Sequence, residues 1–241
     1  MERDLAFAFE LADLAESIAL ARFRAHDLVV DTKPDLSPVT DADRAVEAAL
    51  RARIAERRPD DGVLGEEEGE AGNAAVRWIL DPIDGTRNFS RGIPVWATLI
   101  ALERDGDVVV GVVSAPALRR RWWAVRGGGA FADGTPIRVS QIDTVSEATV
   151  SASSLDDSEI VRRAWHGRNL GDFWQHCLVA EGAVDVAVDP EAWRWDVAAG
   201  ALLVEEAGGR VTGVGGGPPD GSMLSTNGRL HEEALSLLSP G

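Results

Sequence analysis

One stretch constrains the fold of this chain more than any other: residues 78–89, with the sequence WILDPIDGTRNF. Its first residues are apolar and partly β-branched, which is typical of a buried strand. Asp81 follows directly, and Pro82 is expected to end the strand ladder because it has no N–H to donate. Asp84 comes three residues after Asp81 and just before a predicted helix. The stretch therefore predicts two carboxylates at the end of a rigid strand, beside a helix N-terminus.

The two carboxylates favour a bound metal with a phosphate group beside it. Neighbouring carboxylates repel each other unless a cation lies between them, and Mg²⁺ is commonly held by one or two carboxylates together with substrate phosphate. The helix start at Gly85 and Thr86 adds free N–H groups and a positive dipole end, which favour an anion. Asp, Pro and Gly are also ordinary turn residues, so a plain strand-to-turn junction is the alternative interpretation.

Charge and composition narrow the classes of partner. The formal net charge is −16 over 241 residues, so nucleic acid is not an expected partner. The single cysteine, Cys177, allows no internal disulfide. The N-terminal residues resemble neither a signal peptide nor a membrane span, so no membrane is expected and the cytoplasm is the default location. A protein this acidic that binds phosphate is expected to place cations in its site.

Apolar periodicity predicts both helices and strands. Residues 5–23 have helical spacing. A second helix is expected after Thr40, with a capping-box pattern because an acidic residue stands three positions later. Residues 95–125 hold three β-rich runs separated by turns, as in the antiparallel strands of a large sheet. From residue 149 onward strands and helices alternate, including a strand at 184–188 that Asp189-Pro190 is expected to end.

Four motifs, taken in order, resemble those of the inositol monophosphatase family. They are Gly65-Glu66-Glu67, the central DPIDGT of residues 81–86, WDVAAG at 195–200 and EAGG at 206–209. Together they span nearly the whole chain and are far more specific than any one of them. The resemblance implies an αβαβα layered sandwich, an α/β or α+β fold of mixed sheets with helices between and outside them. It also implies a Mg²⁺-dependent phosphatase that forms a homodimer.

The domain organisation follows from the same comparison. No linker cleanly separates two domains, so residues 1–241 are expected to form a single unit. Residues 1–148 would hold the large sheet and most metal ligands, and residues 149–241 would hold the substrate side.

The resemblance implies a site with two metals. One metal would be held by Glu66, Asp81 and the carbonyl of Ile83. A second would be held by Asp81, Asp84 and Asp196, with Asp81 bridging the two, and a third, weaker metal near Glu66 is compatible with the pattern. From the residues alone, Glu66 also belongs to a run of three acids, and such runs are usually solvated.

The resemblance also implies that water is the nucleophile. Thr86, with Glu67 and Asp41 as acid–base partners, would orient that water, and the Gly85 and Thr86 amides would hold phosphate oxygens. For Asp41, a plain acid favoured by the helix dipole is the alternative. Ser154 and Cys177 lack any activating motif for a nucleophile. Arg87 stands where many relatives have lysine, and no role is assigned to it.

Local sequence within the family favours one substrate class. Five stretches resemble the histidinol-phosphatase branch: TKPD at 32–35, RGIPVWA at 91–97, SAPAL at 114–118, RRWWA at 120–124 and GDFW at 171–174. The leading hypothesis is therefore dephosphorylation of L-histidinol phosphate to L-histidinol in histidine biosynthesis. The first alternative is a myo-inositol-1-monophosphatase or another phosphatase of small monoesters. A metal-binding scaffold without catalysis is the non-enzyme alternative.

Three residues are candidates for binding the substrate. Two of them are carboxylates, which can recognise the ammonium group of histidinol, and the third is Arg168. Asp189 stands where the family contacts the leaving group, and Asp172 follows Gly171, where inositol-type relatives carry a small residue. Arg168 stands three residues before Gly171, as in the family. A turn acid at Asp189 and a helix-terminal acid at Asp172 are the alternatives. The segment 154–168 is short, which leaves the shape of this side of the site open.

Overall fold

The computed structural model describes residues 2–72, 75–153 and 158–238. It divides into two compact units, Met1–Arg121 and Trp122–Gly241, which we describe separately. The functional division expected after residue 148 stays a prediction.

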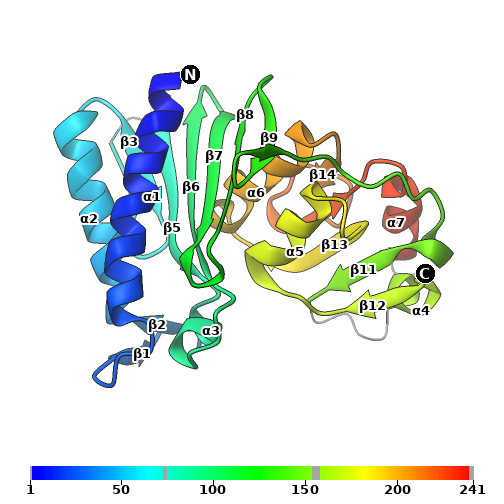
Figure 1. Ribbon diagram of the computed structural model, residues 1–241, viewed down its shortest axis with the longest axis horizontal. Helices are drawn as coiled ribbons and strands as arrows, with labels where there is room; N and C mark the ends of the chain where they lie inside the picture. Colours follow the sequence, from blue (N-terminus) through cyan, green and yellow to red (C-terminus); the bar gives the residue numbers. More distant parts are fainter. Residues whose placement is uncertain (1, 73–74, 154–157, 239–241) are drawn as a thin grey trace. The chain divides into compact units, whose positions relative to one another are not determined.

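Unit 1 begins with a helix and is built around a mixed sheet (Figure 1). Its elements are α1 (Glu2–Arg22), β1 (Val30–Thr32), β2 (Pro38–Thr40), α2 (Asp41–Arg57), β3 (Gly62–Gly65), β4 (Gly69–Ala71), β5 (Val76–Asp84), α3 (Thr86–Ser90), β6 (Ala97–Arg104), β7 (Asp107–Ala115), a short 3-10 turn η1 (Pro116–Leu118) and the first residues of β8 (Arg120–Val125). Within the unit the strand order is β7-β6-β5-β3-β4. Only the β3–β5 pair is parallel; the β7–β6, β6–β5 and β3–β4 pairs are antiparallel.

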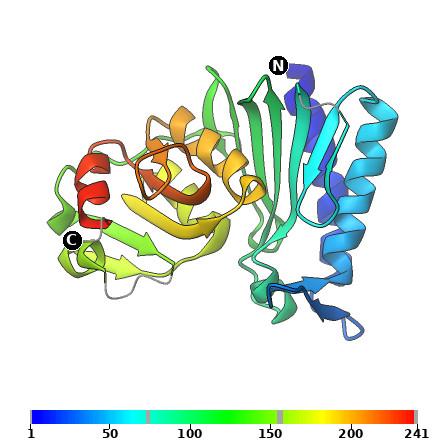
Figure 2. The same ribbon diagram turned by 180° about the vertical axis from the view of Figure 1, so that it is seen from behind.

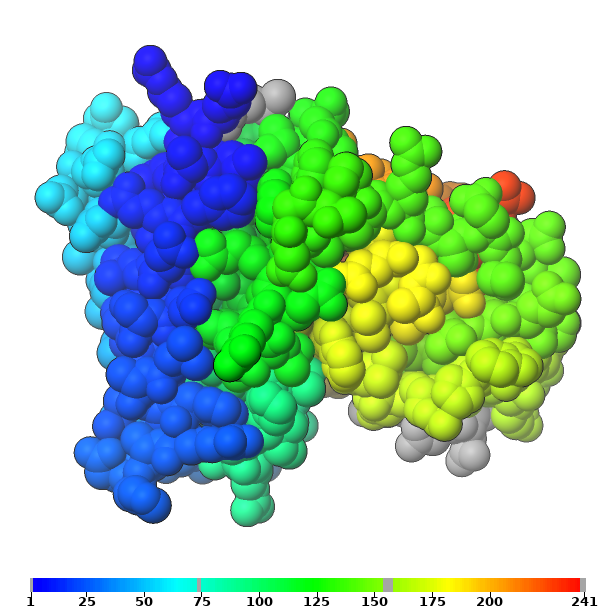
Figure 3. All heavy atoms as spheres, viewed as in Figure 1, coloured from blue at the N-terminus to red at the C-terminus, as the bar shows by residue number. Residues whose placement is uncertain are grey.

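Two helices pack on this sheet and supply its core. In both ribbon views α1 and α2 lie side by side, and α1 packs on β6 and β7 while α2 packs on β5 (Figures 1 and 2). The buried face of α1 includes Phe7, Leu11 and Ala15, which confirms the predicted amphipathic helix. The ring of Phe7 meets that of Trp78 edge-on at 5.2 Å. The opposite face of α1 is open to solvent along the front of the unit (Figure 3).

An aromatic cluster holds α3 against the start of β6. Phe89 is fully buried and lies 4.9 Å from Trp96 and 5.4 Å from Phe23, measured between ring centroids. Such aromatic contacts add to the stabilisation from burial alone. The cluster therefore fixes the helix that follows the two aspartates of β5.

Unit 2 alternates strands and helices, as the sequence predicts (Figure 1). After β8 come β9 (Gly129–Ala132), β10 (Thr135–Pro136), a 3-10 turn η2 (Val145–Glu147), β11 (Thr149–Ala152), α4 (Glu159–Arg163), β12 (His166–Arg168), α5 (Asp172–Ala180), β13 (Val186–Ala192), α6 (Arg194–Glu206), β14 (Arg210–Thr212), β15 (Gly221–Thr226) and α7 (His231–Leu238). A five-stranded sheet has the order β12-β11-β13-β15-β14. In it β11 runs parallel to β12 and β13, while β15 is antiparallel to β13 and β14.

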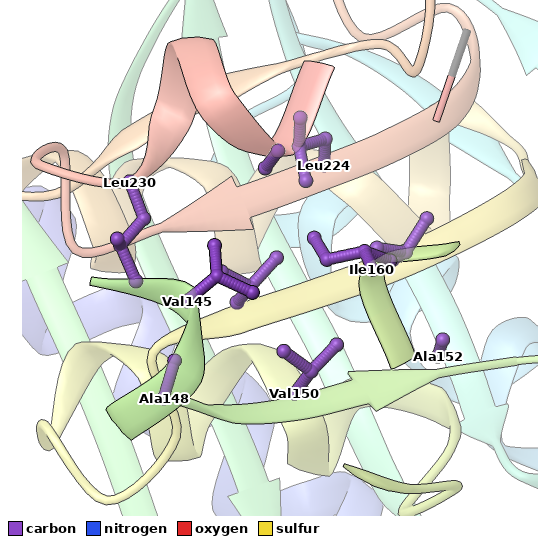
Figure 4. Packing of buried hydrophobic residues seen from close by; sticks show 10 residues of the cluster. Val145, Ala148, Val150, Ala152, Ile160, Leu224 and Leu230 are labelled. Carbon is purple, nitrogen blue, oxygen red and sulfur yellow. The ribbon is translucent and has the colours of Figure 1, made fainter. Parts of the chain in front are cut away.

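The core of unit 2 is aliphatic. Val150 of β11, Leu224 of β15 and Ile160 of α4 meet in one buried cluster, together with Leu230 just before α7 (Figure 4). The side chains of this cluster close one face of the five-stranded sheet under α4 and α7.

Two strand predictions were wrong in the same way. Pro82 and Pro190 were expected to end their strands, but β5 continues to Asp84 and β13 continues to Ala192. In each case the pairing register shifts at the proline step. A bulge leaves one residue out of the ladder, so a proline without an N–H is tolerated there.

No helix within the described residues is long and apolar enough to cross a bilayer.

Candidate active site

The bulge in β5 brings two aspartates onto one face of the strand. Asp81 pairs with Leu99 and Asp84 with Ala97, so three steps along β5 match two steps along β6. Residues three apart in a regular strand point to opposite faces, and the extra residue of a bulge cancels that difference. Carboxylate oxygens of Asp81 and Asp84 consequently lie within 4.8 Å of each other. This spacing suits a shared cation.

The turn after Asp84 depends on a glycine. Gly85 has φ 83°, a left-handed conformation that costs glycine little, and α3 begins at the next residue. Thr86 Oγ lies 2.9 Å from the Ile83 carbonyl and 3.2 Å from Asp43 Oδ1. The hydroxyl has one proton to donate, so these two acceptors compete for it.

Asp43, not Asp41, is the acid of α2 that reaches Thr86. The predicted capping box is confirmed: Asp43 Oδ2 accepts hydrogen bonds from the Thr40 N–H at 2.8 Å and from Thr40 Oγ at 2.5 Å. Asp41 instead pairs with Arg22 at 2.7 Å, and its side chain is 37% exposed. The sequence identified the capping box and named Asp41 as an acid–base partner of Thr86; the contact with Thr86 is made by Asp43, and the role of Asp41 stays a prediction.

Burial makes Asp43 an unusual carboxyl. Its burial raises its pKa to about 6, the hydrogen bonds from Thr40 oppose that rise, and the nearby charges of Glu66 and Glu67 add to it. A buried carboxyl whose pKa lies near neutral pH can accept and return a proton, and this one lies beside the Thr86 hydroxyl.

Lys33 supplies a positive charge to the acidic run after β3. Its Nζ lies 2.7 Å from Glu66 Oε1 and 2.6 Å from Glu67 Oε1. Burial works to lower the pKa of Lys33, but the hydrogen bonds and charges of the two glutamates prevail and raise it. Burial also raises the pKa of Glu67, with Lys33 opposing and Glu66 adding to the rise. The ammonium group shows that these carboxylates are arranged around a cation and are not a solvated charge run.

A buried glutamate of α2 holds the backbone of the same run. Glu47 accepts hydrogen bonds from the Glu67 N–H at 2.7 Å, the Glu68 N–H at 3.0 Å and Arg51 Nε at 2.8 Å. Its side chain is fully buried. A Cβ added to Gly65 would lie 2.2 Å from Glu47 Oε1, so this close approach requires glycine. Glu47 thereby sets the direction in which the acidic run leaves β3.

Sequence reasoning missed Glu47 and identified Asp43 only as the acid of the capping box, although a signal for the burial of both was present. Asp43, Glu47, Leu50 and Ile54 recur at helical spacing on the buried face of α2. Acids on an otherwise apolar face are rarely buried without a role, because burial of an unpaired charge is costly. Lys33 offered no comparable signal, since it lies in a polar loop.

The candidate residues of unit 2 lie on four different elements. Asp196 is the third residue of α6, and its Oδ2 accepts the Trp193 N–H at 2.7 Å. Asp189 of β13 has Oδ2 2.9 Å from His176 Nε2. Asp172 opens α5 with φ 48°, which is uncommon for a residue other than glycine. Arg168 ends β12, exposed, with Nη1 donating to the Gly167 carbonyl at 2.9 Å.

Asp189 is ionised more readily than an ordinary aspartate. Burial opposes this, but the hydrogen bond and charge of His176 lower the pKa of Asp189, with further hydrogen bonds from Ser153 and Gln175. Of the short segment 154–168, residues 154–157, including Ser154, lie outside the described residues.

Comparison with known proteins identifies the architecture and the chemistry. The model of the inositol monophosphatase family matches residues 1–239. The chain belongs to the inositol monophosphatase family. It is 51% identical to a histidinol-phosphatase of Mycobacterium tuberculosis, with 99% of this chain and 98% of that protein covered. It is 48% identical to a histidinol-phosphatase of Streptomyces coelicolor, covering 98% and 97% of the two chains.

A solved structure confirms the fold class. The IMPase of Thermotoga maritima superposes with a TM-score of 0.90 at 32% identity, covering 99% of this chain and 97% of that one. The chain is therefore an α/β layered sandwich of this family and a phosphomonoester hydrolase. The roles of the individual site residues stay predictions.

We expect Gly65→Ala to damage both stability and the acidic run. The added Cβ must displace the Glu47 carboxylate and break hydrogen bonds to a buried charge, so the free energy of unfolding should fall by about 2 kcal/mol. Denaturant unfolding measures this. Gly215→Ala is the matched control, because a Cβ there meets nothing within 4 Å among the described residues. Equal stability of the two variants would show that Glu47 moves aside without loss.

Proposed function

We propose that this chain hydrolyses L-histidinol phosphate to L-histidinol and inorganic phosphate, with Mg²⁺ as cofactor. The observation that carries the proposal is identity of 51% and 48% to two histidinol-phosphatases over nearly their full lengths. The carboxylates of unit 1 support the metal chemistry, and the ionised Asp189 of unit 2 supports recognition of a cationic leaving group.

The oxygen donors fit magnesium. Mg²⁺ prefers carboxylate, carbonyl and water oxygens, and Asp81, Asp84, Glu66 and the Ile83 carbonyl are of this type. We propose these residues and Asp196 of α6 as ligands for two ions, with a third, weaker ion near Glu66. Bound Mg²⁺ would stabilise charge on the phosphoryl group and make a water molecule acidic.

The protein's own groups then orient the attack. The Thr86 hydroxyl would align the attacking water, with Asp43 holding that hydroxyl in place of the Asp41 expected from the sequence. Glu67 would accept a proton, as its raised pKa suits a general base. The amides of Gly85 and Thr86, at the start of α3, would hold phosphate oxygens.

The finer expectations belong to the same proposal. A place in histidine biosynthesis follows from the substrate, and a cytoplasmic location and a homodimeric assembly follow from the family resemblance. Asp172 and Arg168 are proposed to flank the leaving group together with Asp189. The strained backbone of Asp172 supports this, because residues with unfavourable φ gather at functional sites.

The first test is phosphate release with and without Mg²⁺ from histidinol phosphate, inositol phosphates, fructose bisphosphate and phosphoadenosine phosphate. We expect histidinol phosphate to have the highest kcat/KM. Asp84→Asn should lower turnover on the order of a hundredfold or more, because a neutral amide binds a hard cation poorly. Mg²⁺ should raise the melting temperature of the wild type and raise that of Asp84→Asn less. A preference for inositol phosphates would overturn the substrate assignment but keep the metal site.

A second prediction separates the two acids at the start of α2. Asp43→Asn should lower kcat about ten- to a hundredfold, because it disturbs the partner of the Thr86 hydroxyl. Asp41→Asn weakens the partly buried ion pair with Arg22 but leaves the contact between Asp43 and Thr86 in place, so it should keep kcat within about twofold. Single-turnover phosphate release measures both. The reverse order of losses would restore Asp41 as the functional acid.

A third prediction concerns the leaving group. A hydrogen bond to a charged group is worth about 1.5–3 kcal/mol, so Asp189→Asn should lower kcat/KM for histidinol phosphate about ten- to a hundredfold. The amine-free ester para-nitrophenyl phosphate should lose much less, because the metal chemistry is untouched. Equal losses on both substrates would assign Asp189 to the fold or the metal site.

A further inference from the structure

His176 of α5 joins Asp189 to a third element of unit 2. Its Nε2 lies 2.9 Å from Asp189 Oδ2, and its Nδ1 lies 2.9 Å from Ser225 Oγ of β15. The imidazole is therefore held on both sides by hydrogen bonds from two neighbouring strands. Because both ring nitrogens are bonded, the orientation of the His176 ring is restricted.

The partners determine where the protons lie. The Asp189 carboxylate only accepts, so His176 Nε2 must carry a proton and donate it. In the neutral ring Nδ1 then accepts from the Ser225 hydroxyl. With the ring neutral, the hydrogen bonds run from Ser225 to His176 to Asp189, whereas a protonated ring would donate to both partners.

Exposure separates the roles of the two residues. The His176 side chain is 4% exposed, whereas that of Asp189 is 17% exposed. A ligand can therefore reach the carboxylate but not the imidazole. Any effect of His176 on a ligand must be transmitted through Asp189.

Two further residues besides His176 hold the Asp189 carboxylate by hydrogen bonds. Gln175 and Ser153 also donate to Asp189, and Gln175 Oε1 is in turn held by Ser151 Oγ at 2.7 Å. Asp189 stands where the pairing of β13 with β15 shifts register. Bulges of this kind re-aim side chains and are common beside functional sites. The network thus holds an ionised carboxylate at a bent strand end, with part of its surface open.

We propose that His176 is a positioning residue that holds Asp189 in the orientation that recognises the ammonium group of the leaving alcohol. The inference rests on the proposed function, since it assigns the specificity of that reaction to the Ser225–His176–Asp189 chain. A mobile carboxylate would also bind a cation, but it would lose conformational entropy whenever the ligand binds. Because the buried imidazole already holds the carboxylate in one orientation, little of this entropy is lost on binding.

The test uses two substitutions of one residue. His176→Leu removes the donor to Asp189, whereas His176→Gln keeps an N–H at the same number of bonds from the backbone. The ratio of kcat/KM for histidinol phosphate to that for para-nitrophenyl phosphate should fall about tenfold in His176→Leu, mainly through KM. His176→Gln should recover most of the ratio. A purely structural role would lower both substrates together.

A double-mutant cycle shows whether the effect passes through Asp189. If it does, His176→Leu should change the substrate ratio little in an Asp189→Asn background, because the group it orients has already been altered. Additive losses would overturn the proposal. If His176→Leu does not fold, Ser225→Ala takes its place: it removes only the Nδ1 partner and should lower the ratio about threefold, with an unchanged ratio overturning the proposal.

The outcome also distinguishes this inference from the proposed function. A wild type that shows no preference for histidinol phosphate over the amine-free ester overturns both. A wild type that shows the preference, with equal losses on both substrates in His176→Leu, overturns the role of His176 alone.

Discussion

Repulsion among carboxylates is the constraint on which unit 1 depends. Two like charges about 4 Å apart repel by roughly 4 kcal/mol near a protein surface, and this unit gathers several acids at the ends of β3 and β5 and the start of α2. Four of these acids have a specific compensation. Glu47 takes two backbone N–H groups and Arg51, Asp43 takes the Thr40 cap, and Lys33 bridges Glu66 and Glu67. The fold can therefore hold an acidic site together before any metal binds.

The aspartate–proline step serves both units in the same way. Asp81-Pro82 in β5 and Asp189-Pro190 in β13 each fall at a register shift. In β5 the shift places a second aspartate on the same face. In β13 the shift begins at Asp189, whose carboxylate contacts His176 of α5. The proline has no N–H to donate, so it fits a bulge, where one residue is left out of the hydrogen-bond ladder. The aspartate before it is held on a strand, which orients its side chain better than a flexible loop would.

Membership of the family accounts for the type of reaction, while substrate choice rests on other residues. The proposed metal and phosphate chemistry draws on acids, a threonine and backbone amides, which would serve any phosphate monoester. For discrimination between leaving groups, we propose the polar network around the Asp189 carboxylate in unit 2.

The sequence by itself determined the class of the fold, the family and the stretch of paired aspartates. It also determined the helix of residues 5–23 and the capping box at Thr40, because these depend on residues within four positions of each other. Only the tertiary structure decided that Asp43 and not Asp41 meets Thr86, which lies 43 residues away. It also decided the contacts of Glu47, Lys33 and His176, which join segments 13 to 49 residues apart. Proline rules failed at both bulges because they assume a regular ladder, and whether a strand stays regular depends on its neighbour in the sheet.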